Sequence, residues 1–295
     1  MIDLHIHTKC SDGCNTPSEI LKMAEDLKLE YISITDHDTC QAYFEIEKNR
    51  KIYSGKIIAG CEMQTTFKGL NIEVLCYGIE YEKVNNWCEK KFSIEVKKRQ
   101  VLEEILRGIK VCNDLNIKYD KDVLLKSNEV RSSSNILLME ICKYEENKDK
   151  FPEDAWNNLE VFYRKYRSNE EDVWYIGERN IFPSLGELIQ LVKEDGGLLF
   201  LAHPCEYKIY DMDIFLKELF FEHKLDGIEC YHSTFTDEES EFLVRFCSQN
   251  NLYISGGTDY HGGEVRKGNS IGIGTGNMNI KTDTIKDWVN KVKII

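Results

Sequence analysis

The 295-residue sequence contains no apolar run close to the roughly 18 residues that a membrane-spanning helix needs. Its amino terminus also lacks the basic segment followed by an apolar one that marks a secretory signal peptide. The eleven cysteines are an odd number, and no two stand in Cys-x-x-Cys spacing. We therefore expect a cytoplasmic protein whose cysteines are reduced thiols, with no membrane partner.

Positive charge is also scarce. The chain has 38 Lys and Arg against 51 Asp and Glu, a formal net charge of −13. Such an acidic chain is not expected to bind duplex DNA, because that binding rests on contacts between basic side chains and phosphates. A small phosphorylated substrate remains compatible with this charge, since bound divalent cations make a site locally positive.

Histidines are few, and their placement is uneven. The chain has seven, and none occurs between His37 and His203. Only His223 falls inside a predicted helix. The other six lie at or next to the ends of predicted strands: His5, His7, His37, His203, His232 and His261. Because acidic or turn-forming residues surround them, we predict a site for more than one metal ion.

The first strand illustrates the pattern. Ile2, Leu4 and Ile6 alternate with Asp3, His5 and His7. Residues two apart on a strand share a face, roughly 6–7 Å apart, so His5 and His7 are predicted to direct two imidazoles to one place. Asp12 follows in a loop that contains Gly13. For the His-x-His pair alone, two surface histidines on an edge strand are the competing interpretation.

Strands and helices alternate along the rest of the chain. Strands are predicted over 31–35, 56–61, 63–67, 70–77, 198–202, 227–231 and 252–255. Capping-box patterns at Thr16–Glu19, Ser184–Glu187 and Thr236–Glu239 open helices between them. Asp36, His37 and Glu62 directly follow strands, as Asp259 and His261 do later. This order predicts an α/β barrel with its site at the carboxyl ends of the strands.

Residues 81–180 have a different character. Helices are predicted over 87–115, 120–126, 132–144 and 153–166, with a charged connector over 145–150. We interpret this stretch as a helical insertion that covers or shapes the substrate site. Residues 1–80 and 181–295 would then form the barrel, which closes with a helix over 283–293.

Seven short motifs together resemble the PHP (polymerase and histidinol phosphatase) superfamily. They are Asp3-Leu-His-Ile-His-Thr8, Ser11-Asp-Gly13, Ile34-Thr-Asp-His-Asp-Thr39, Gly60-Cys-Glu62, Ala202-His-Pro204, Gly227-Ile-Glu-Cys-Tyr231 and Gly257-Thr-Asp-Tyr-His-Gly262. The helical insertion followed by an Ala-His-Pro strand is most similar to the stand-alone phosphoesterases that act on nucleotides and short oligonucleotides.

The resemblance implies a distorted (β/α)7 barrel with two or three divalent ions, of manganese, zinc, iron or magnesium. By motif position, His5, His7, Glu62 and Asp259 would hold one ion, and Glu62 would bridge it to a second ion held with His203 and Glu73. Asp12, His37 and His261 would hold the third. The implied reaction is hydrolysis of a phosphate ester by a hydroxide that bridges the ions.

Two departures from the family pattern concern the site. Glu73 stands where relatives usually carry a histidine, which would make the second ion site harder and favour manganese or magnesium over zinc, or weaken catalysis. Relatives often show an Arg-Pro-His-type motif where this chain reads Arg131-Ser-Ser-Ser-Asn135. Arg131 and Arg266 are candidate phosphate contacts, with surface roles as the alternative.

Two further residues are candidates for catalysis. His232 is a candidate for contacting phosphate or protonating the leaving oxygen, against a structural role. Asp36, at the end of its strand, is a second catalytic candidate.

Four functions remain open from the sequence. The first is a phosphoesterase acting on nucleotides or short RNA. The others are a histidinol-phosphate-type phosphatase of small metabolites, an amidohydrolase-type deaminase or amidase, and a degenerate metal-binding module without catalysis. The deaminase is disfavoured by Asp12 and Glu62, which fit the PHP pattern better. The degenerate module is supported only by Glu73.

Overall fold

The structure is a computed structural model that describes residues 1–126, 132–169, 171–176, 182–207, 209–263, 265 and 267–295. It divides into two compact units. The first unit consists of Met1–Lys90 and Phe182–Ile295, and the second of Lys91–Ile181. The chain thus leaves the first unit once and returns to it, and each unit is described by itself.

The first unit contains two sheets. The first sheet is parallel, in the order β1 (Ile2–Ile6), β2 (Tyr31–Ile34), β3 (Lys56–Ile57). The second runs in the order β4 (Gly60–Phe67), β5 (Leu70–Tyr77), β6 (Leu198–Leu201), β7 (Gly227–His232), β8 (Tyr253–Gly257). The pairs β4–β5 and β5–β6 are antiparallel, whereas β6–β7 and β7–β8 are parallel. The α/β prediction is confirmed.

A closed barrel is not formed by these ladders. Among the described residues, no backbone ladder joins the two sheets, and isolated β-bridges such as Ile6–Tyr260 and His37–Glu62 lie beside the histidine-rich strand ends. The tight hairpin of β4 and β5 reverses the chain direction, so the regular strand–helix alternation is interrupted at this point. The strand pairing of the structure therefore does not establish the predicted closed (β/α)7 barrel.

Six helices accompany these strands in the described part of the first unit: α1 (Pro17–Asp26), α2 (Ala42–Asn49), α3 (Tyr81–Lys91, which ends at the unit boundary), α8 (Leu185–Lys193), α9 (Met212–Glu222) and α10 (Asp237–Asn250). The three predicted capping boxes are confirmed at the starts of α1, α8 and α10. In each, the cap hydroxyl accepts from the backbone of a glutamate three residues on, whose carboxylate accepts from the cap backbone.

An aromatic group forms part of the core of the first unit. Tyr77 stacks on Trp288 with ring centroids 5.4 Å apart, and Phe200 packs against both rings. The Tyr77 hydroxyl donates to the Leu4 carbonyl at 2.9 Å, while the Trp288 indole N–H donates to the Ile254 carbonyl at 2.8 Å. These bonds fasten β1 and β8 to the core next to the residues that carry the site.

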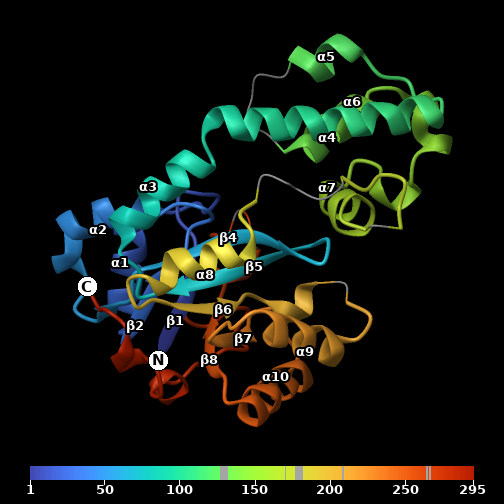
Figure 1. Cartoon of the computed structure of the whole chain (residues 1–295). Helices are drawn as coiled ribbons and strands as arrows, with labels where there is room; N and C mark the ends of the chain where they lie inside the picture. The colour runs from blue at the N-terminus through green and yellow to red at the C-terminus, as the bar shows by residue number, and fades with distance from the viewer. Residues whose placement is uncertain (127–131, 170, 177–181, 208, 264, 266) are drawn as a thin grey trace. The chain divides into compact units, whose positions relative to one another are not determined.

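The second unit is helical. Its elements are α4 (Ile94–Asp114), α5 (Lys121–Lys126), α6 (Ser133–Ile141), a 3₁₀ turn over Glu145–Lys150, a second over Glu153–Ala155, α7 (Leu159–Val161) and a π-helical turn over Phe162–Arg167. Helices α4 and α6 lie side by side (Figure 1) and bury Ile105 and Leu137 in a core with Phe162 and Trp174. The Arg167 side chain is fully buried and donates to the hydroxyl of Ser133.

Several predicted helices differ from the structure. The helix expected over 87–115 breaks at Ser93, whose hydroxyl caps α4 by accepting from the Val96 backbone. The stretch expected as a helix over 153–166 has a 3₁₀ turn at Glu153–Ala155 and then a continuous helical segment of α and π geometry over Leu159–Val161 and Phe162–Arg167. The stretch expected as a helix over 283–293 instead forms 3₁₀ turns at Thr282–Ile285 and Val289–Lys291. Helix α2 begins at Ala42 and is followed by a 3₁₀ turn over Arg50–Ile52. The connector 145–150 is a 3₁₀ turn that buries Asn147.

In the described part of the chain, we find no helix long and apolar enough to cross a membrane.

Candidate metal centre

Four buried side chains converge at the carboxyl ends of β1 and β8 and near the start of β4. We call His5, His7, Glu62 and Asp259 the inner cluster. The Nε2 atoms of His5 and His7 lie 3.1 Å apart, and each lies 3.2 Å from Glu62 Oε2. Asp259 Oδ1 lies 3.3 Å from His5 Nε2 and 3.0 Å from His7 Nε2. The expectation that the His-x-His pair directs both rings to one place is confirmed.

Glu62 stands between two groups of donors. Its Oε2 faces the inner cluster and also lies 3.2 Å from His37 Nδ1, whereas its Oε1 lies 2.9 Å from His203 Nε2. Glu73 completes this side, with Oε1 3.6 Å from His37 Nδ1 and Oε2 3.4 Å from His203 Nε2. We call His37, Glu62 and Glu73 the edge cluster. The two carboxylate oxygens of Glu62 thus face different sets of ligands.

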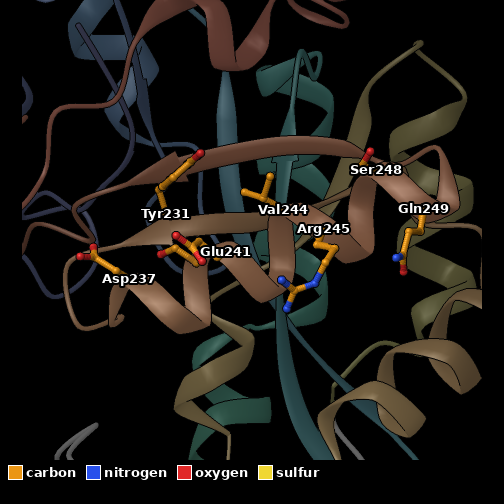
Figure 2. Close-up of a pocket in the computed structure, with 8 residues that line it drawn as sticks. Tyr231, Asp237, Glu241, Val244, Arg245, Ser248 and Gln249 are labelled. Atoms are coloured by element: carbon orange, nitrogen blue, oxygen red, sulfur yellow. The ribbon is translucent and has the colours of Figure 1, made fainter.

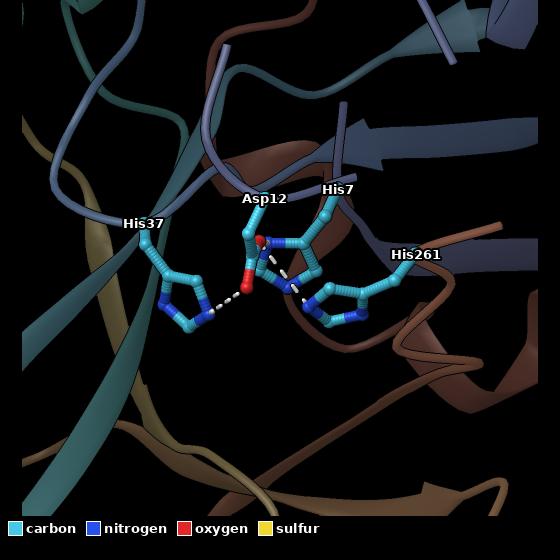
Figure 3. Close-up of side chains that lie close together, drawn as sticks. All are labelled: His7, Asp12, His37 and His261. Carbon is cyan, nitrogen blue, oxygen red and sulfur yellow. Dashed lines mark ion pairs between the residues drawn. The ribbon is translucent and has the colours of Figure 1, made fainter. Parts of the chain in front are cut away.

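A further group lies at the more open side of the site. The outer cluster consists of His7, Asp12, His37 and His261 (Figure 3). Asp12 is at its centre, with Oδ1 3.3 Å from His261 Nε2 and 3.6 Å from His7 Nδ1, and Oδ2 3.8 Å from His37 Nε2. Eight of the nine residues predicted as metal ligands thus lie in these three adjacent groups. The ninth, His203, lies beside Glu62 and Glu73 of the edge cluster.

Three residues in or next to the site have backbone conformations with positive φ angles. Asp38, His203 and Asp259 each follow a strand and adopt positive φ angles of 52°, 25° and 52°. Such conformations cost about 1–3 kcal/mol each in a non-glycine residue and are kept only where the surroundings fix them. Gly257 allows β8 to approach β1, because a Cβ there would lie 2.3 Å from the His5 nitrogen.

Asp3 ties the first strand to the segment that carries Asp259. Its fully buried carboxylate accepts from the backbone N–H and the hydroxyl of Thr258, at 2.9 and 2.7 Å. It also accepts from the Gly272 N–H at 2.7 Å. Since Thr258 directly precedes Asp259, these bonds fix the position of a cluster residue relative to β1.

Electrostatics couple the histidines to the carboxylates. Burial disfavours protonation of His5, but the negative charges of Glu229, Glu62 and Asp259 outweigh it and raise its pKa well above the usual value. Against the same effect of burial, Asp259 and Glu62 raise the pKa of His7 to about 10. Burial opposes ionisation of Glu62 and Asp259, yet nearby histidines, His5 foremost, hold both pKa values well below their usual range. The site therefore stabilises ionised carboxylates that require positive charge beside them.

The inner cluster fits a divalent cation. Nitrogen and oxygen ligands about 2.0–2.1 Å from a tetrahedrally bound ion lie about 3.3 Å from one another. The separations between imidazole nitrogens and carboxylate oxygens in this cluster are 3.0–3.3 Å. Imidazole and carboxylate are the ligands that zinc, manganese and iron share.

A family model decides the identity of the fold. The PHP domain model matches residues 3–197, which include the inner and edge cluster residues up to Glu73. The chain belongs to the PHP domain family.

Several relatives of this PHP protein have the names of enzymes that cleave phosphate esters. A phosphoribosyl 1,2-cyclic phosphate 1,2-diphosphodiesterase of Eggerthella lenta is 24% identical over 266 residues, which cover 88% of this chain and 94% of the relative. The 5'-3' exoribonuclease Rnm of Escherichia coli is 25% identical over 271 residues, 88% of this chain and 84% of the relative. The family prediction is confirmed, and the predicted chemistry agrees with these names.

The fold of the PHP protein is also similar to solved structures. A protein of Bifidobacterium adolescentis, described as a metal-dependent phosphoesterase, has a TM-score of 0.65 at 22% identity, covering 99% of this chain and 96% of the other. A second structure, of a Chromobacterium violaceum protein described as an amidohydrolase, has a TM-score of 0.64 at 20% identity, covering 88% and 87%. These similarities establish the fold.

The remaining predicted site residues of the PHP protein are placed differently. Both carboxylate oxygens of Asp36 are engaged: Oδ1 accepts from the Thr8 N–H and the Ser11 hydroxyl, and Oδ2 from the Thr8 hydroxyl. Asp36 thus holds the loop after β1 rather than facing the clusters. The His232 ring is fully buried against Asp259. Arg131 and Arg266 lie outside the described residues.

Sequence reasoning missed Glu229. This fully buried residue of β7 accepts from His5 Nδ1 at 2.9 Å and from the backbone N–H of His203 at 2.8 Å. The signal that could have identified it is an acidic residue in the otherwise apolar stretch Gly227-Ile-Glu-Cys-Tyr231.

A surface groove lies elsewhere on this unit of the PHP protein. It runs along α10 and is lined by Tyr231 of β7 together with Glu241, Arg245 and Ser248 (Figure 2). None of the residues that line it belongs to the inner, edge or outer cluster.

Proposed function

We propose that this PHP protein is a metal-dependent phosphoesterase that hydrolyses phosphate esters of nucleotides or short oligonucleotides. The observation that carries the proposal is the position of Glu62. Its Oε2 lies 3.2 Å from nitrogens of His5, His7 and His37, and its Oε1 lies 2.9 Å from His203. One carboxylate placed between separate nitrogen donors is the arrangement expected of a ligand that bridges two ions.

The ligand assignment follows from the clusters. His5, His7, Glu62 and Asp259 would hold one ion, Glu62 with Glu73 and His203 a second, and Asp12, His37 and His261 a third. His37 also lies within reach of the second group. When bound, divalent ions polarise phosphoryl oxygens and lower the pKa of a water molecule that attacks phosphorus in line. Manganese, zinc, iron and magnesium are the candidate ions.

The four carboxylates of the site make it strongly negative before any metal binds. Asp12, Glu62, Glu73 and Asp259 concentrate negative charge, which repels a phosphate unless cations are present. The overall charge of −13 gives no general attraction for an anion. We therefore expect phosphate binding itself, and not catalysis alone, to depend on metal.

The substrate class rests on the relatives. Those at 24–25% identity are named for a phosphoribosyl cyclic phosphate and for RNA, and one at 20% identity is named a 3',5'-nucleoside bisphosphate phosphatase. A phosphorylated nucleoside is common to most of these names, so we infer a nucleotide-like substrate or short RNA. Three further statements remain predictions. The second unit covers or shapes the substrate site, and the protein is cytoplasmic. The first unit is a distorted (β/α)7 barrel, which the bridges Ile6–Tyr260 and His37–Glu62 support.

The test is phosphate release from a panel of substrates. Nucleotides with 5', 3' and 3',5' phosphates, a cyclic phosphate, short RNA and histidinol phosphate are each incubated with protein and Mn²⁺, and again with chelator. We expect metal-dependent release from the nucleotide or RNA group. Release confined to histidinol phosphate would instead identify a small-metabolite phosphatase.

Controls separate catalysis from contamination. Asp259→Ala removes an inner-cluster carboxylate and should eliminate release. His223→Ala removes a histidine that packs on the edge of Phe67, 5.7 Å between ring centroids, away from the clusters, and should leave release unchanged. Absence of release from every substrate, in a protein that still binds metal, would favour the degenerate metal-binding module.

A further inference from the structure

An irregularity in β7 places two side chains beside the inner cluster. Glu229 pairs with Ser255 and Tyr231 with Gly256, so Cys230 is an extra residue with no partner of its own on β8. Such a bulge changes which residues share a face of the strand. In a regular strand the side chains of Glu229 and Tyr231 would lie on the same face. Because of the bulge, the side chains of Glu229 and His232 share a face instead.

The pairing with β8 shows which face this is. His232 pairs with Gly257, and a Cβ on Gly257 would lie 2.4 Å from the His5 Cβ. Ser255 and Gly257 share a face of β8 because they are two residues apart. Glu229 and His232, which pair with them, therefore lie on the His5 side. Tyr231 pairs with Gly256 on the opposite face and lines the groove of Figure 2.

Glu229 holds two histidines at once. Its Oε1 lies 2.9 Å from His5 Nδ1 and its Oε2 accepts from the His203 backbone N–H at 2.8 Å. Because a carboxylate only accepts, the proton of the neutral His5 ring must be on Nδ1. The lone pair of Nε2 then points toward His7, Glu62 and Asp259. The second bond fixes His203 in its left-handed conformation, with φ of 25°.

His232 holds the fourth member of the cluster. Its Nδ1 contacts the Thr234 hydroxyl at 2.8 Å and the Thr234 backbone N–H at 3.3 Å. Its Nε2 lies 3.2 Å from Asp259 Oδ2 and, because a carboxylate only accepts, donates a proton to that oxygen. The other oxygen of Asp259, Oδ1, lies within 3.4 Å of nitrogens of His5, His7 and His261. His232 thus fixes which oxygen of Asp259 faces the cluster.

We infer that Glu229 and His232, brought to one face by the bulge in β7, are positioning residues that orient His5, His203 and Asp259 to bind a divalent ion. The inference rests on the proposed metal-dependent function and adds residues that contact no substrate. Both oxygens of Glu229 and both ring nitrogens of His232 are already engaged, which leaves neither side chain a free atom to contact phosphate. It replaces the expectation that His232 protonates the leaving oxygen.

The test measures metal affinity. Full-length protein is stripped of metal and titrated with Mn²⁺, and with Zn²⁺, in competition with a fluorescent chelator. Glu229→Gln keeps the size of the side chain but offers one oxygen to two donors. His232→Leu removes the donor to Asp259, whereas His232→Gln can place an amide N–H where Nε2–H lies. Tyr231→Phe, on the other face of the same strand, is the matched control.

We expect the affinity for metal to fall by about 10- to 100-fold in Glu229→Gln and in His232→Leu. This is the range typical of changes to residues that are hydrogen-bonded to metal ligands. His232→Gln should recover most of it, and Tyr231→Phe should bind like the parent. Thermal unfolding of the metal-free proteins verifies that each variant folds. If Glu229→Gln does not fold, the His232 pair decides.

Other outcomes are equally informative. Parent-like affinity in a folded Glu229→Gln together with His232→Leu would overturn the inference, as would failure of His232→Gln to bind better than His232→Leu. If the parent protein binds metal but releases no phosphate, the proposed function fails while the affinities still decide the inference. If the parent binds no metal, both fail.

Discussion

The inner and outer clusters share His7 but differ in their contact with solvent. The inner side chains are almost completely buried, with relative exposures of 0% for His5, His7 and Glu62 and 2% for Asp259. In the outer cluster the Asp12 side chain is 54% exposed and that of His37 24% exposed. The inner donors lie in or just beyond strands, whereas Asp12 and His37 lie in loops.

This difference separates two tasks within one site. A buried carboxylate is costly unless a cation or hydrogen bonds compensate it, so the inner cluster should bind its ion tightly. The inner ligands are also fixed by Asp3, Glu229 and His232. Asp12 receives less support from the fold and lies where a substrate can approach. We expect the outer ion to exchange more readily.

The largest effect is expected from Asp259→Ala in the inner cluster. Bound metal contributes several kcal/mol to phosphoryl transfer, and each 1.4 kcal/mol is a factor of ten. Phosphate release should therefore fall by about 10³-fold or more while circular dichroism stays unchanged. His37→Ala should also abolish release, since His37 belongs to both the outer and the edge cluster. Undiminished turnover in either variant would contradict the assignment.

Metal removal should expose the difference in affinity directly. Graded chelation is expected to remove metal in at least two stages, and activity should be lost in the first, when the outer ion leaves. Restoring metal at 100 times its dissociation constant should raise the free energy of unfolding by about 2.7 kcal/mol. Metal content and thermal unfolding are measured at each chelator concentration. Loss of all metal in a single stage would contradict the expected difference in affinity between the inner and outer ions.

A smaller effect is expected from Asp12→Asn. The substitution keeps an oxygen ligand but removes the charge that His7, His37 and His261 surround. We expect the affinity of the outer ion to fall by roughly 10- to 100-fold. The free energy of unfolding should change by less than about 0.5 kcal/mol, because the side chain is exposed. Denaturant unfolding and metal titration test both statements, and a large loss of stability would show that Asp12 is not at an open side.

The smallest change is expected from Glu73→His in the edge cluster. A nitrogen donor replaces an oxygen donor, so relative affinity should shift from manganese toward zinc. The ratio of the two dissociation constants is measured by competition. Glu73→Gln, which retains an oxygen near Gln64, should shift the ratio less. An unchanged ratio in Glu73→His would mean that Glu73 is not a ligand.

The sequence predicted those features that depend on local pattern. Alternation in Ile2–Ile6 placed His5 and His7 together, and the cap residues Thr16, Ser184 and Thr236 marked three helix starts. A site at the carboxyl ends of the strands was expected from the alternation of strands and helices. The assignment of distant residues to separate ions followed from the resemblance to the PHP superfamily.

Features that depend on packing could not be predicted. The bulge at Cys230 reverses the faces expected for Tyr231 and His232, and no residue type announces it. The segment from Thr282 to Lys291 has apolar residues spaced three or four apart, which suits an α-helix or 3₁₀ turns equally. Stacking of Trp288 on Tyr77 is part of the tertiary packing that selects between them. The strands on either side of the turn at 68–69 were predicted, and β4 and β5 form this hairpin. That β5 then pairs antiparallel with β6, which interrupts the expected barrel, depends on tertiary packing.

The pairing of β1 with residues near the end of the chain has a consequence during synthesis. The His7 N–H donates to the Tyr260 carbonyl at 2.8 Å, yet the ribosome makes these residues roughly 13–50 s apart at 5–20 residues per second. Through that interval the apolar first strand has no β8 beside it. The inner cluster cannot be complete before Asp259 is added, and the outer cluster cannot be complete before His261 is added. We therefore expect metal to be acquired late, by a nearly finished chain, and nascent chains to depend on protection of the first strand.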